Sequence, residues 1–336
     1  MEVIAVAGEM KAIVLTSSGN LIETEVPKPA PGDRDLLVEV RAVSVNPVDT
    51  KQRAEEGKLR ILGWDVAGIV REVGPACTLF RPGDEVYYAG DITRPGGFSE
   101  YHVVDERLVG PKPRTSDFAQ AAALPLTTLT AWEGLFEKLG VQANGGADKR
   151  ILIVGAAGGV GSMAVQLARW AGLEVIGTAS RPESTKWVRE YGAHHVIDHY
   201  EPFRPQLEAL GISGVDAVFC LNVVEPNWDA MLDVLVPGGK LCTILPPNSP
   251  VNLRPLFDKS LTWAMEGMFT RARFRTPDMQ EQHRILVEVS GLVDSGEIRT
   301  TMNRYLSPIS AANLERAFAE IRSGRSIGKI VLESFA

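Results

Sequence analysis

The sequence predicts an α/β protein with a mostly antiparallel β domain and a doubly wound parallel sheet. A change of pattern along the chain supports this prediction. From residue 10 to about residue 124, short β-rich segments are separated by turns, whereas from about residue 144 to residue 245 short apolar runs alternate with helical segments. Strands that alternate with helices form a parallel sheet covered on both faces. With 336 residues, the chain is long enough for two domains.

The first region contains short strands. Strands are expected at residues 11–16, 36–44, 66–73, 85–88 and 100–104. In the second of these segments apolar and polar side chains alternate, which is typical of a strand with one buried face. Segments rich in proline and glycine predict turns at residues 27–32, 81–84 and 94–97.

The second region predicts a strand–helix repeat. Its strands are expected at residues 151–154, 173–179, 195–197, 215–220 and 240–245, and its helices at residues 160–171, 183–191 and 228–235. Glycine-rich turns are expected at residues 144–146 and 237–239. Two further helices, at residues 278–295 and 310–322, precede a last strand at residues 329–332, and Ser310 is a good N-cap for the second helix.

Composition excludes several classes of protein. A net charge of −7 argues against a nucleic-acid or anionic-membrane surface. No apolar run approaches the roughly 20 residues of a membrane span. The first nine residues lack the pattern of a secretory signal, so a cytoplasmic protein is expected. Cys77, Cys220 and Cys242 form no CxxC pair and are interpreted as buried small hydrophobic residues in a reducing compartment.

The strongest local signal is a glycine-rich loop that follows a predicted strand and opens a predicted helix. It has the pattern G-x-x-G-x-x-G and consists of Gly155, Ala156, Ala157, Gly158, Gly159, Val160 and Gly161. Glycine permits the tight turn and lets the backbone approach a pyrophosphate, to which the helix N-terminus offers free N–H groups. In its strand–helix context the loop predicts a dinucleotide site.

The end of the next strand indicates which dinucleotide is bound. A cofactor without a 2′-phosphate usually meets an Asp or Glu there. This chain instead has Ser180 and Arg181, with Lys186 soon after. A guanidinium binds a phosphate bidentately, so NADPH is predicted. The alternative is that Arg181 and Lys186 are only the solvated start of a helix.

An ordered set of motifs runs along nearly the whole chain. Together the motifs resemble the medium-chain dehydrogenase/reductase superfamily, in particular its zinc-independent quinone oxidoreductase (zeta-crystallin-like) and zinc-type alcohol dehydrogenase-like branch. They are Val45-Asn-Pro-Val-Asp49, Gly63-Trp-Asp-Val-Ala-Gly68, Pro82-Gly-Asp-Glu-Val86, Gly97-Phe-Ser-Glu-Tyr101, Leu129-Thr-Ala-Trp132, residues 155–161 and Ile327-Gly-Lys-Ile-Val331.

The resemblance implies a domain organisation. It suggests a GroES-like catalytic domain over residues 1–126, a Rossmann NADPH-binding domain over residues 127–270, and a segment over residues 271–336 that returns to the catalytic domain. A homodimer is the expectation that this family carries.

The residues that bind catalytic zinc in metal-dependent relatives are replaced here. At the family's two Cys positions and its His position, this chain has Asn46, Leu126 and Trp64 respectively. Such a site needs three protein ligands. The cysteine-rich lobe for structural zinc is also missing, and His195 and His199 are interpreted as a strand running into a loop. No metal is therefore expected.

The resemblance also suggests residues for the reaction. Asn46 falls where the family contacts substrate, with the alternative that it only forms a turn before Pro47. Asp49 is a further candidate or merely orients that loop, and Trp64 is expected to wall the substrate pocket. Thr130 falls where the superfamily contacts the nicotinamide, with a helix-start hydroxyl as the alternative.

The same family pattern adds two cofactor contacts. Asn222 follows a Rossmann strand and is expected near the nicotinamide, and Lys329 is expected near the cofactor unless it is a solvated charge.

The predicted function is hydride transfer from NADPH to a quinone or an α,β-unsaturated carbonyl compound. Without a Lewis acid, alcohol oxidation loses the group that acidifies the hydroxyl, whereas a conjugated acceptor needs mainly positioning and a hydrogen-bond donor. Two alternatives stay open: a trans-acting enoyl reductase of a polyketide or fatty-acid pathway, and a non-catalytic dinucleotide-binding protein. The lack of a tyrosine between Thr50 and Gly63 weakens the enoyl-thioester reading.

Overall fold

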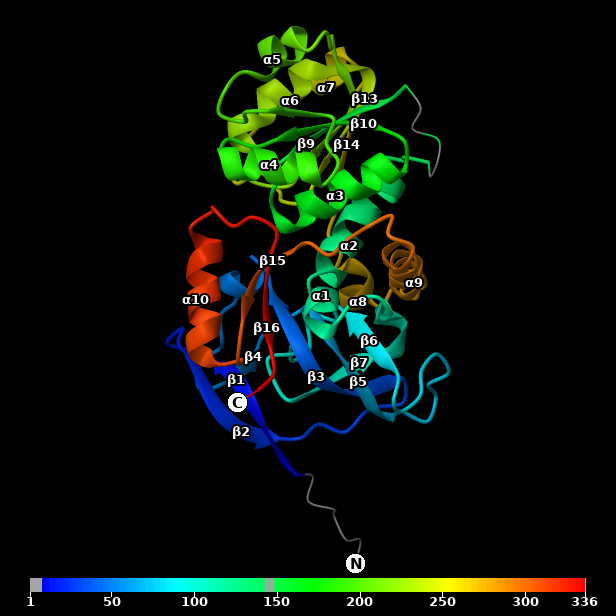
Figure 1. Ribbon diagram of the computed structural model, residues 1–336. Helices are drawn as coiled ribbons and strands as arrows, with labels where there is room; N and C mark the ends of the chain where they lie inside the picture. Colours follow the sequence, from blue (N-terminus) through cyan, green and yellow to red (C-terminus); the bar gives the residue numbers. More distant parts are fainter. Residues whose placement is uncertain (1–7, 143–144, 146–147, 336) are drawn as a thin grey trace, which may run out of the picture. The chain divides into compact units, whose positions relative to one another are not determined.

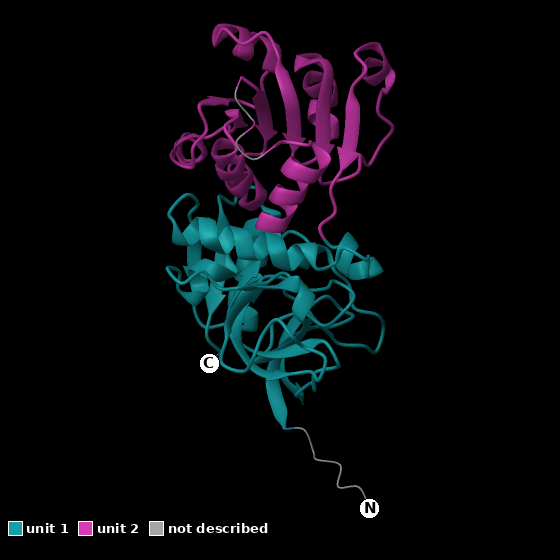
Figure 2. Ribbon diagram, turned by 90° about the vertical axis from the view of Figure 1, so that its right-hand side faces the viewer, with its two compact units in different colours: residues 1–126, 269–336 teal, residues 127–268 magenta. Residues whose placement is uncertain are grey.

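The computed structural model describes residues 8–142, 145 and 148–335 (Figure 1). The predicted turn at residues 144–146 and the first nine residues, which lack a secretory-signal pattern, lie largely outside these described residues. The chain forms two compact units: unit 1 contains residues 1–126 and 269–336, and unit 2 contains residues 127–268 (Figure 2).

Unit 1 is built on a mostly antiparallel sheet with the strand order β15-β16-β3-β5-β6-β8, in which β7 also pairs with β3. A smaller sheet has the order β2-β1-β4. The bounds of these strands are β1 Glu9–Leu15, β2 Leu21–Pro27, β3 Asp35–Val45, β4 Arg60–Ile61, β5 Val66–Val73, β6 Glu85–Tyr88, β7 Tyr101–Asp105, β8 Val109–Pro111, β15 Met302–Leu306 and β16 Lys329–Glu333.

Helices cover the strands of unit 1. Helix α10 packs against β2, β3 and β16, whereas α9 packs against β8 (Figure 1). Ser310 caps α10, since its hydroxyl accepts a hydrogen bond from the N–H of Asn313, as predicted. The helical segments of this unit are η1 Asp49–Lys51, η2 Glu106–Leu108, α1 Phe118–Ala122, α8 Thr270–Phe274, α9 Glu281–Asp294 and α10 Ala311–Arg322.

Unit 2 is a parallel sheet with the strand order β11-β10-β9-β12-β13-β14. Its strands are β9 Arg150–Val154, β10 Glu174–Thr178, β11 His195–Ile197, β12 Val215–Cys220, β13 Leu235–Thr243 and β14 Thr262–Met265. Its helical segments are α2 Pro125–Trp132, which begins at the end of unit 1, η3 Glu133–Lys138, α3 Gly159–Trp170, α4 Pro182–Glu190, α5 Phe203–Ala209, η4 Glu225–Asn227, α6 Trp228–Val234 and α7 Arg254–Asp258.

Helices cover both faces of the parallel sheet. Neighbouring residues of β10 point to opposite faces, so the contacts of two successive residues show what covers each face. Ile176 belongs to a buried cluster with Leu207 of α5 and Met231 of α6. A Cβ atom at the next residue, Gly177, would lie 2.6 Å from Val188 of α4. Helices α5 and α6 therefore cover one face and α4 the other, which confirms the predicted α/β fold class.

Several elements differ from the prediction. The edge strand β2 was not predicted, since its Glu-Thr-Glu sequence is mostly exposed, and β4, β8 and β15 are short or polar. The turn expected at residues 237–239 lies inside β13, where the pairing with β12 shifts register. Cys77 is only partly buried, because it lies in a turn after β5, where its thiol donates to the carbonyl of Asp35. No helix in the described part of the chain is long and apolar enough to span a membrane.

Candidate functional site

The glycine-rich loop of unit 2 forms a sharp turn between β9 and α3. Gly155 has a φ of +87°, a conformation that side chains with a Cβ rarely adopt. Gly158 is the N-cap of α3. A Cβ atom at Gly161 would lie 2.3 Å from the carbonyl oxygen of Gly155, so only glycine lets the helix approach the loop this closely. The geometry fits a pyrophosphate at the N-terminus of α3, where the first N–H groups lack helical partners.

The remaining loop residues divide by exposure. Gly159, Ala157 and Val160 are partly exposed at the start of α3. Ala156 is fully buried, and its N–H donates to the carbonyl of Thr178 at 3.3 Å. The Thr178 hydroxyl also accepts the N–H of Gly155 at 3.0 Å. Thr178, which was not predicted as a site residue, therefore ties the loop to the end of β10.

A hollow of about 610 Å³ lies at the carboxyl end of β10. Its lining includes the predicted Ser180, Arg181 and Lys186, together with Arg189, which was not predicted. A basic residue that follows Lys186 by three positions on one helix would have been a usable signal. Acidic side chains are present as well. Arg181 lies 3.4 Å from Glu183, Lys186 lies 3.8 Å from Glu190, and Glu190 and Asp198 line the hollow.

Two further predicted residues belong to unit 2. Asn222 follows β12, and a Cβ atom at Gly155 would lie 3.5 Å from its amide nitrogen, so the Asn222 side chain borders the glycine-rich loop. Thr130 is buried in the interior of α2, which begins at Pro125, so it does not supply the hydroxyl of a helix start.

Unit 1 contains a buried polar cluster of Asn46, Asp65 and Lys329. The Lys329 ammonium lies 3.0 Å from the Asp65 carboxylate and donates to the Asn46 amide oxygen and to the Val45 carbonyl. The Asn46 amide nitrogen donates to Asp65 at 2.7 Å. Asp65 also accepts the N–H of Leu126 at 2.7 Å. Burial raises the pKa of Asp65, and these donors oppose that shift. Lys329 is therefore not a solvated charge.

Asp49 is linked to this cluster. One of its carboxyl oxygens accepts the backbone N–H of Asn46 at 2.7 Å. Burial raises the pKa of Asp49 to about 7, against the N–H of Asn46 and the nearby Lys329 ammonium, which lower it. An acid with this pKa is partly protonated near neutral pH, so it can donate a hydrogen bond or a proton.

Trp64 is fully buried in unit 1. Its indole N–H donates to the carbonyl of Asp91 at 3.1 Å, and its ring meets that of Phe269 edge-on, with the ring centroids 6.3 Å apart. Phe269 is distant from Trp64 in the sequence, and only the fold brings the two rings together. These contacts hold the indole in one orientation.

The side chains at the family's zinc-ligand positions do not fit a catalytic zinc ion. Asn46, Trp64 and Leu126 offer no thiolate or imidazole. The Asn46 amide is already bonded to Asp65 and Lys329. Within the described ranges, no group of three or more His, Cys, Asp or Glu side chains is arranged to hold a metal ion.

Two known protein families match separate regions of the chain. Residues 32–114 match the family described as the alcohol dehydrogenase GroES-like domain, and residues 159–283 match the zinc-binding dehydrogenase family. A zinc-type alcohol dehydrogenase-like protein of Staphylococcus aureus is 39% identical over 319 residues, which cover 94% of this chain and 95% of that protein. The chain belongs to the medium-chain dehydrogenase/reductase superfamily. It is an oxidoreductase of the zinc-type alcohol dehydrogenase-like branch.

Other members of this superfamily cover most of the chain. The quinone oxidoreductase of Sus scrofa is 34% identical over 70% of this chain and 71% of its own length. The 2-methylene-furan-3-one reductase of Solanum lycopersicum is 29% identical over 98% of this chain and 80% of its own length.

Solved structures of the superfamily have the same fold. One from Rhizobium etli CFN 42, described as a presumed zinc-dependent alcohol dehydrogenase, has a TM-score of 0.93 and 49% identity over 98% of this chain and 99% of that chain. A mycobacterial protein complexed with NADPH has a TM-score of 0.83 and 28% identity over 96% of this chain and 99% of that chain. Members of the superfamily bind NAD(P), and the glycine-rich loop fits that cofactor.

Proposed function

We propose that this oxidoreductase transfers a hydride from NADPH to a quinone or an α,β-unsaturated carbonyl compound without a catalytic metal ion. The observation that carries the proposal is the basic hollow at the end of β10, which Ser180, Arg181 and Lys186 line. A guanidinium matches a phosphate bidentately, whereas an enzyme for NAD usually presents a carboxylate to the ribose at this position. The NADPH complex of the mycobacterial relative supports the same cofactor.

The cofactor would be held by unit 2. The N–H groups at the start of α3, where Gly159 and Val160 are partly exposed, would bind the pyrophosphate, and Arg181 and Lys186 would bind the 2′-phosphate. Asn222 and Thr130 are proposed to contact the nicotinamide. NADPH supplies the hydride when it is bound. Lys329 is left out of this set, since its ammonium is buried against Asp65, Asn46 and the Val45 carbonyl.

The acceptor is proposed to be a conjugated carbonyl compound because Asn46, Trp64 and Leu126 replace the family's zinc ligands and no other fitting set occurs among the described residues of unit 1. Such an acceptor needs a hydrogen bond to its developing oxyanion rather than a Lewis acid. The Asp49 carboxyl and the Asn46 amide are the proposed donors, and Trp64 supports the substrate-binding loop. In the balanced reaction the acceptor would gain a hydride from bound NADPH and one proton from the Asp49 carboxyl or water, with NADP⁺ as the other product. The pig quinone oxidoreductase and the tomato reductase support this acceptor class.

We further propose domain boundaries at residues 1–126, 127–270 and 271–336, with the last segment completing the catalytic domain. A homodimer stays a prediction.

The test follows oxidation of NADPH and of NADH with a panel of quinones and enones, using chelator-treated protein. We expect acceptor-dependent oxidation that favours NADPH and is unchanged by chelation. Loss of activity after chelation would contradict the metal-free proposal. Saturable NADPH binding without turnover of any acceptor would favour the carrier-dependent enoyl reductase or the non-catalytic protein.

A further inference from the structure

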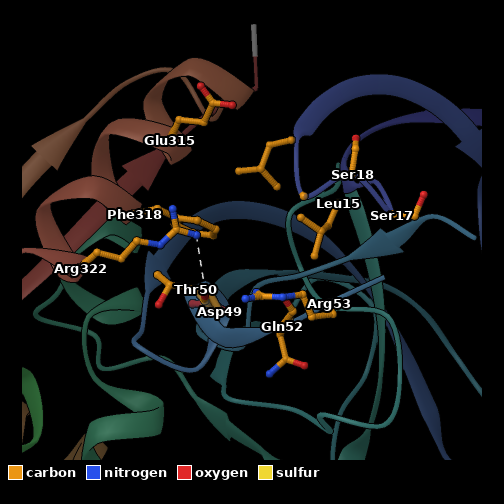
Figure 3. A pocket seen from close by; sticks show the side chains of 12 residues that line it. Leu15, Ser17, Ser18, Asp49, Thr50, Gln52, Arg53, Glu315, Phe318 and Arg322 are labelled. Atoms are coloured by element: carbon orange, nitrogen blue, oxygen red, sulfur yellow. Dashed lines mark hydrogen bonds between the residues drawn. The ribbon is translucent and has the colours of Figure 1, made fainter. Parts of the chain in front are cut away.

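A cavity of about 690 Å³ lies entirely within unit 1 (Figure 3). Three separate segments form its walls: the turn between β1 and β2, residues 49–53 around η1, and helix α10. This cavity was not predicted, because its walls come from both ends of the chain. It adjoins the proposed reaction site, since Asp49 is one of its lining residues.

Part of the cavity wall is apolar. Leu15, Leu21 and Phe318 line it, and all three are buried. Apolar and aromatic side chains of this kind bury the body of a small organic ligand. Ser17 and Ser18 add hydroxyl groups to the lining (Figure 3).

Two guanidinium groups extend into the cavity. Arg53 and Arg322 come from different segments, and Figure 3 shows both side chains directed toward its centre. Arg53 donates to the carbonyl of Gln52 at 2.9 Å, and Arg322 lies over the Phe318 ring and has a long contact of 3.5 Å to the Thr50 carbonyl. No carboxylate of the described residues lies within ion-pair distance of either guanidinium. Glu315 also lines the cavity but forms no ion pair with either guanidinium among the described residues. Two cations that lack an ion pair, beside an apolar wall, favour an organic anion.

Asp49 contributes a different group to the cavity lining. Asp49 is almost fully buried, and its second carboxyl oxygen has no hydrogen-bond partner of normal geometry. A buried polar atom without a partner is costly, and a ligand that hydrogen-bonds to it removes that cost. The cavity therefore offers guanidinium groups to an anion and, when Asp49 is protonated, a hydrogen-bond donor to a carbonyl group.

We propose that this cavity binds the acceptor, and that the preferred acceptors are conjugated carbonyl compounds with an apolar body and a carboxylate. The carboxylate lies between Arg53 and Arg322, the body packs on Phe318 and its neighbours, and the carbonyl oxygen faces Asp49. This inference rests on the proposed function and deepens it by naming the substrate class.

The first test compares two acceptors that differ by a single para-carboxylate group, 4-phenylbut-3-en-2-one and its para-carboxylate. We expect the wild type to have a higher kcat/KM for the carboxylate. A hydrogen bond to a charged group contributes about 1.5–3 kcal/mol, so Arg322→Ala and Arg53→Ala should each lower kcat/KM for the carboxylate by roughly 10- to 100-fold. The neutral enone should change less than about twofold. Arg316→Ala is the matched control, since Arg316 lies on α10 but does not line the cavity.

The second test measures binding without catalysis. Calorimetry with the saturated ketone 4-(3-oxobutyl)benzoate, in the absence of NADPH, should detect binding to the wild type and the control but not to the double variant Arg53→Ala/Arg322→Ala. Turnover of the neutral enone with no preference for the carboxylate would overturn the cavity proposal and leave the proposed function intact. Binding of the saturated ketone without turnover of any acceptor would overturn the proposed function and the acceptor assignment, while the anion site would stand.

Discussion

The ammonium of Lys329 lies 3.0 Å from the carboxylate of Asp65 in the interior of unit 1, where both side chains are almost completely buried. The pair joins β16 to the segment before β5, and both partners also bond to the Asn46 amide. Water is largely excluded, so the two charges depend on each other and on these hydrogen bonds. Through these hydrogen bonds the pair positions the side chain of Asn46, the proposed substrate contact.

Replacement of Lys329 should strongly destabilise the protein. Lys329→Met leaves the buried Asp65 without its cation, and removal of one partner of a buried pair costs about 3–5 kcal/mol. Urea unfolding of the full chain measures this loss. The control is Lys28→Met, because Lys28 lies 3.7 Å from Glu72 in a partly exposed surface pair, and such pairs contribute about 0–1 kcal/mol. Equal losses of unfolding free energy in the two variants would contradict a larger contribution of the buried pair to stability.

Replacement of Arg181 should change cofactor preference. Arg181→Ala removes a proposed 2′-phosphate ligand, so KM for NADPH should rise by roughly 10- to 100-fold, the equivalent of about 1.5–3 kcal/mol for a charge-assisted hydrogen bond. KM for NADH should stay nearly constant. Initial rates with both cofactors provide the measurement. Arg204→Ala serves as the control, since Arg204 is paired with Asp233 and does not line the hollow. Equal effects on both cofactors would contradict a phosphate contact.

Replacement of Gly161 should weaken cofactor binding. In Gly161→Ala the new Cβ would lie 2.3 Å from the carbonyl oxygen of Gly155, so either α3 or the glycine-rich loop must shift. The dissociation constant for NADPH, measured by fluorescence titration, should rise at least about tenfold, which corresponds to about 1.4 kcal/mol. Gly291→Ala is the matched helix control, since a Cβ there meets nothing within 4 Å, and alanine favours a helix by about 0.5–1 kcal/mol. NADPH binding unchanged in Gly161→Ala would rule out this account of the loop.

Asp49 should control the pH dependence of the reaction. Its pKa is raised to about 7, chiefly by burial, so the protonated donor is lost as pH rises through neutrality and kcat/KM should fall. Lys329 and Asp65 face Asp49 from the buried cluster, and Arg53, Arg322 and Glu315 line the cavity with it. Asp49→Asn should lower the rate and remove this limb of the pH profile. Glu315→Gln, an exposed change in the same cavity, should leave the limb in place.

The same pKa predicts an effect on stability. Because burial raises the folded-state pKa of Asp49 above the ordinary 3.8, its contribution is fully present below about pH 4 and is lost as pH rises to about 7. The unfolding free energy of Asp49→Asn, relative to the wild type, should therefore increase between these pH values. Parallel curves for the two proteins would argue against the raised pKa.

Local patterns in the sequence were sufficient to predict many of the secondary-structure elements of this protein. Some elements depend only on neighbouring residues, so their positions were predicted closely. They are the alternating strand β3, the strand β9, the helix α3 that follows it, and the N-cap Ser310. The glycine-rich loop could also be predicted from local sequence, since the seven residues 155–161 encode both its turn and the start of its helix. Short or edge elements such as β2 and β15 have weak local signals and were not predicted.

Other features exist only because distant segments pair. Strand β16 lies antiparallel to β3 with Ile330 opposite Val45, and this register brings Lys329 to Asn46. No spacing in the chain encodes that contact, so the sequence alone does not predict it. The cavity likewise joins the β1–β2 turn, η1 and α10. A local pattern determines which face of an element is apolar, whereas strand pairing and burial determine which distant charges meet and how their pKa values shift.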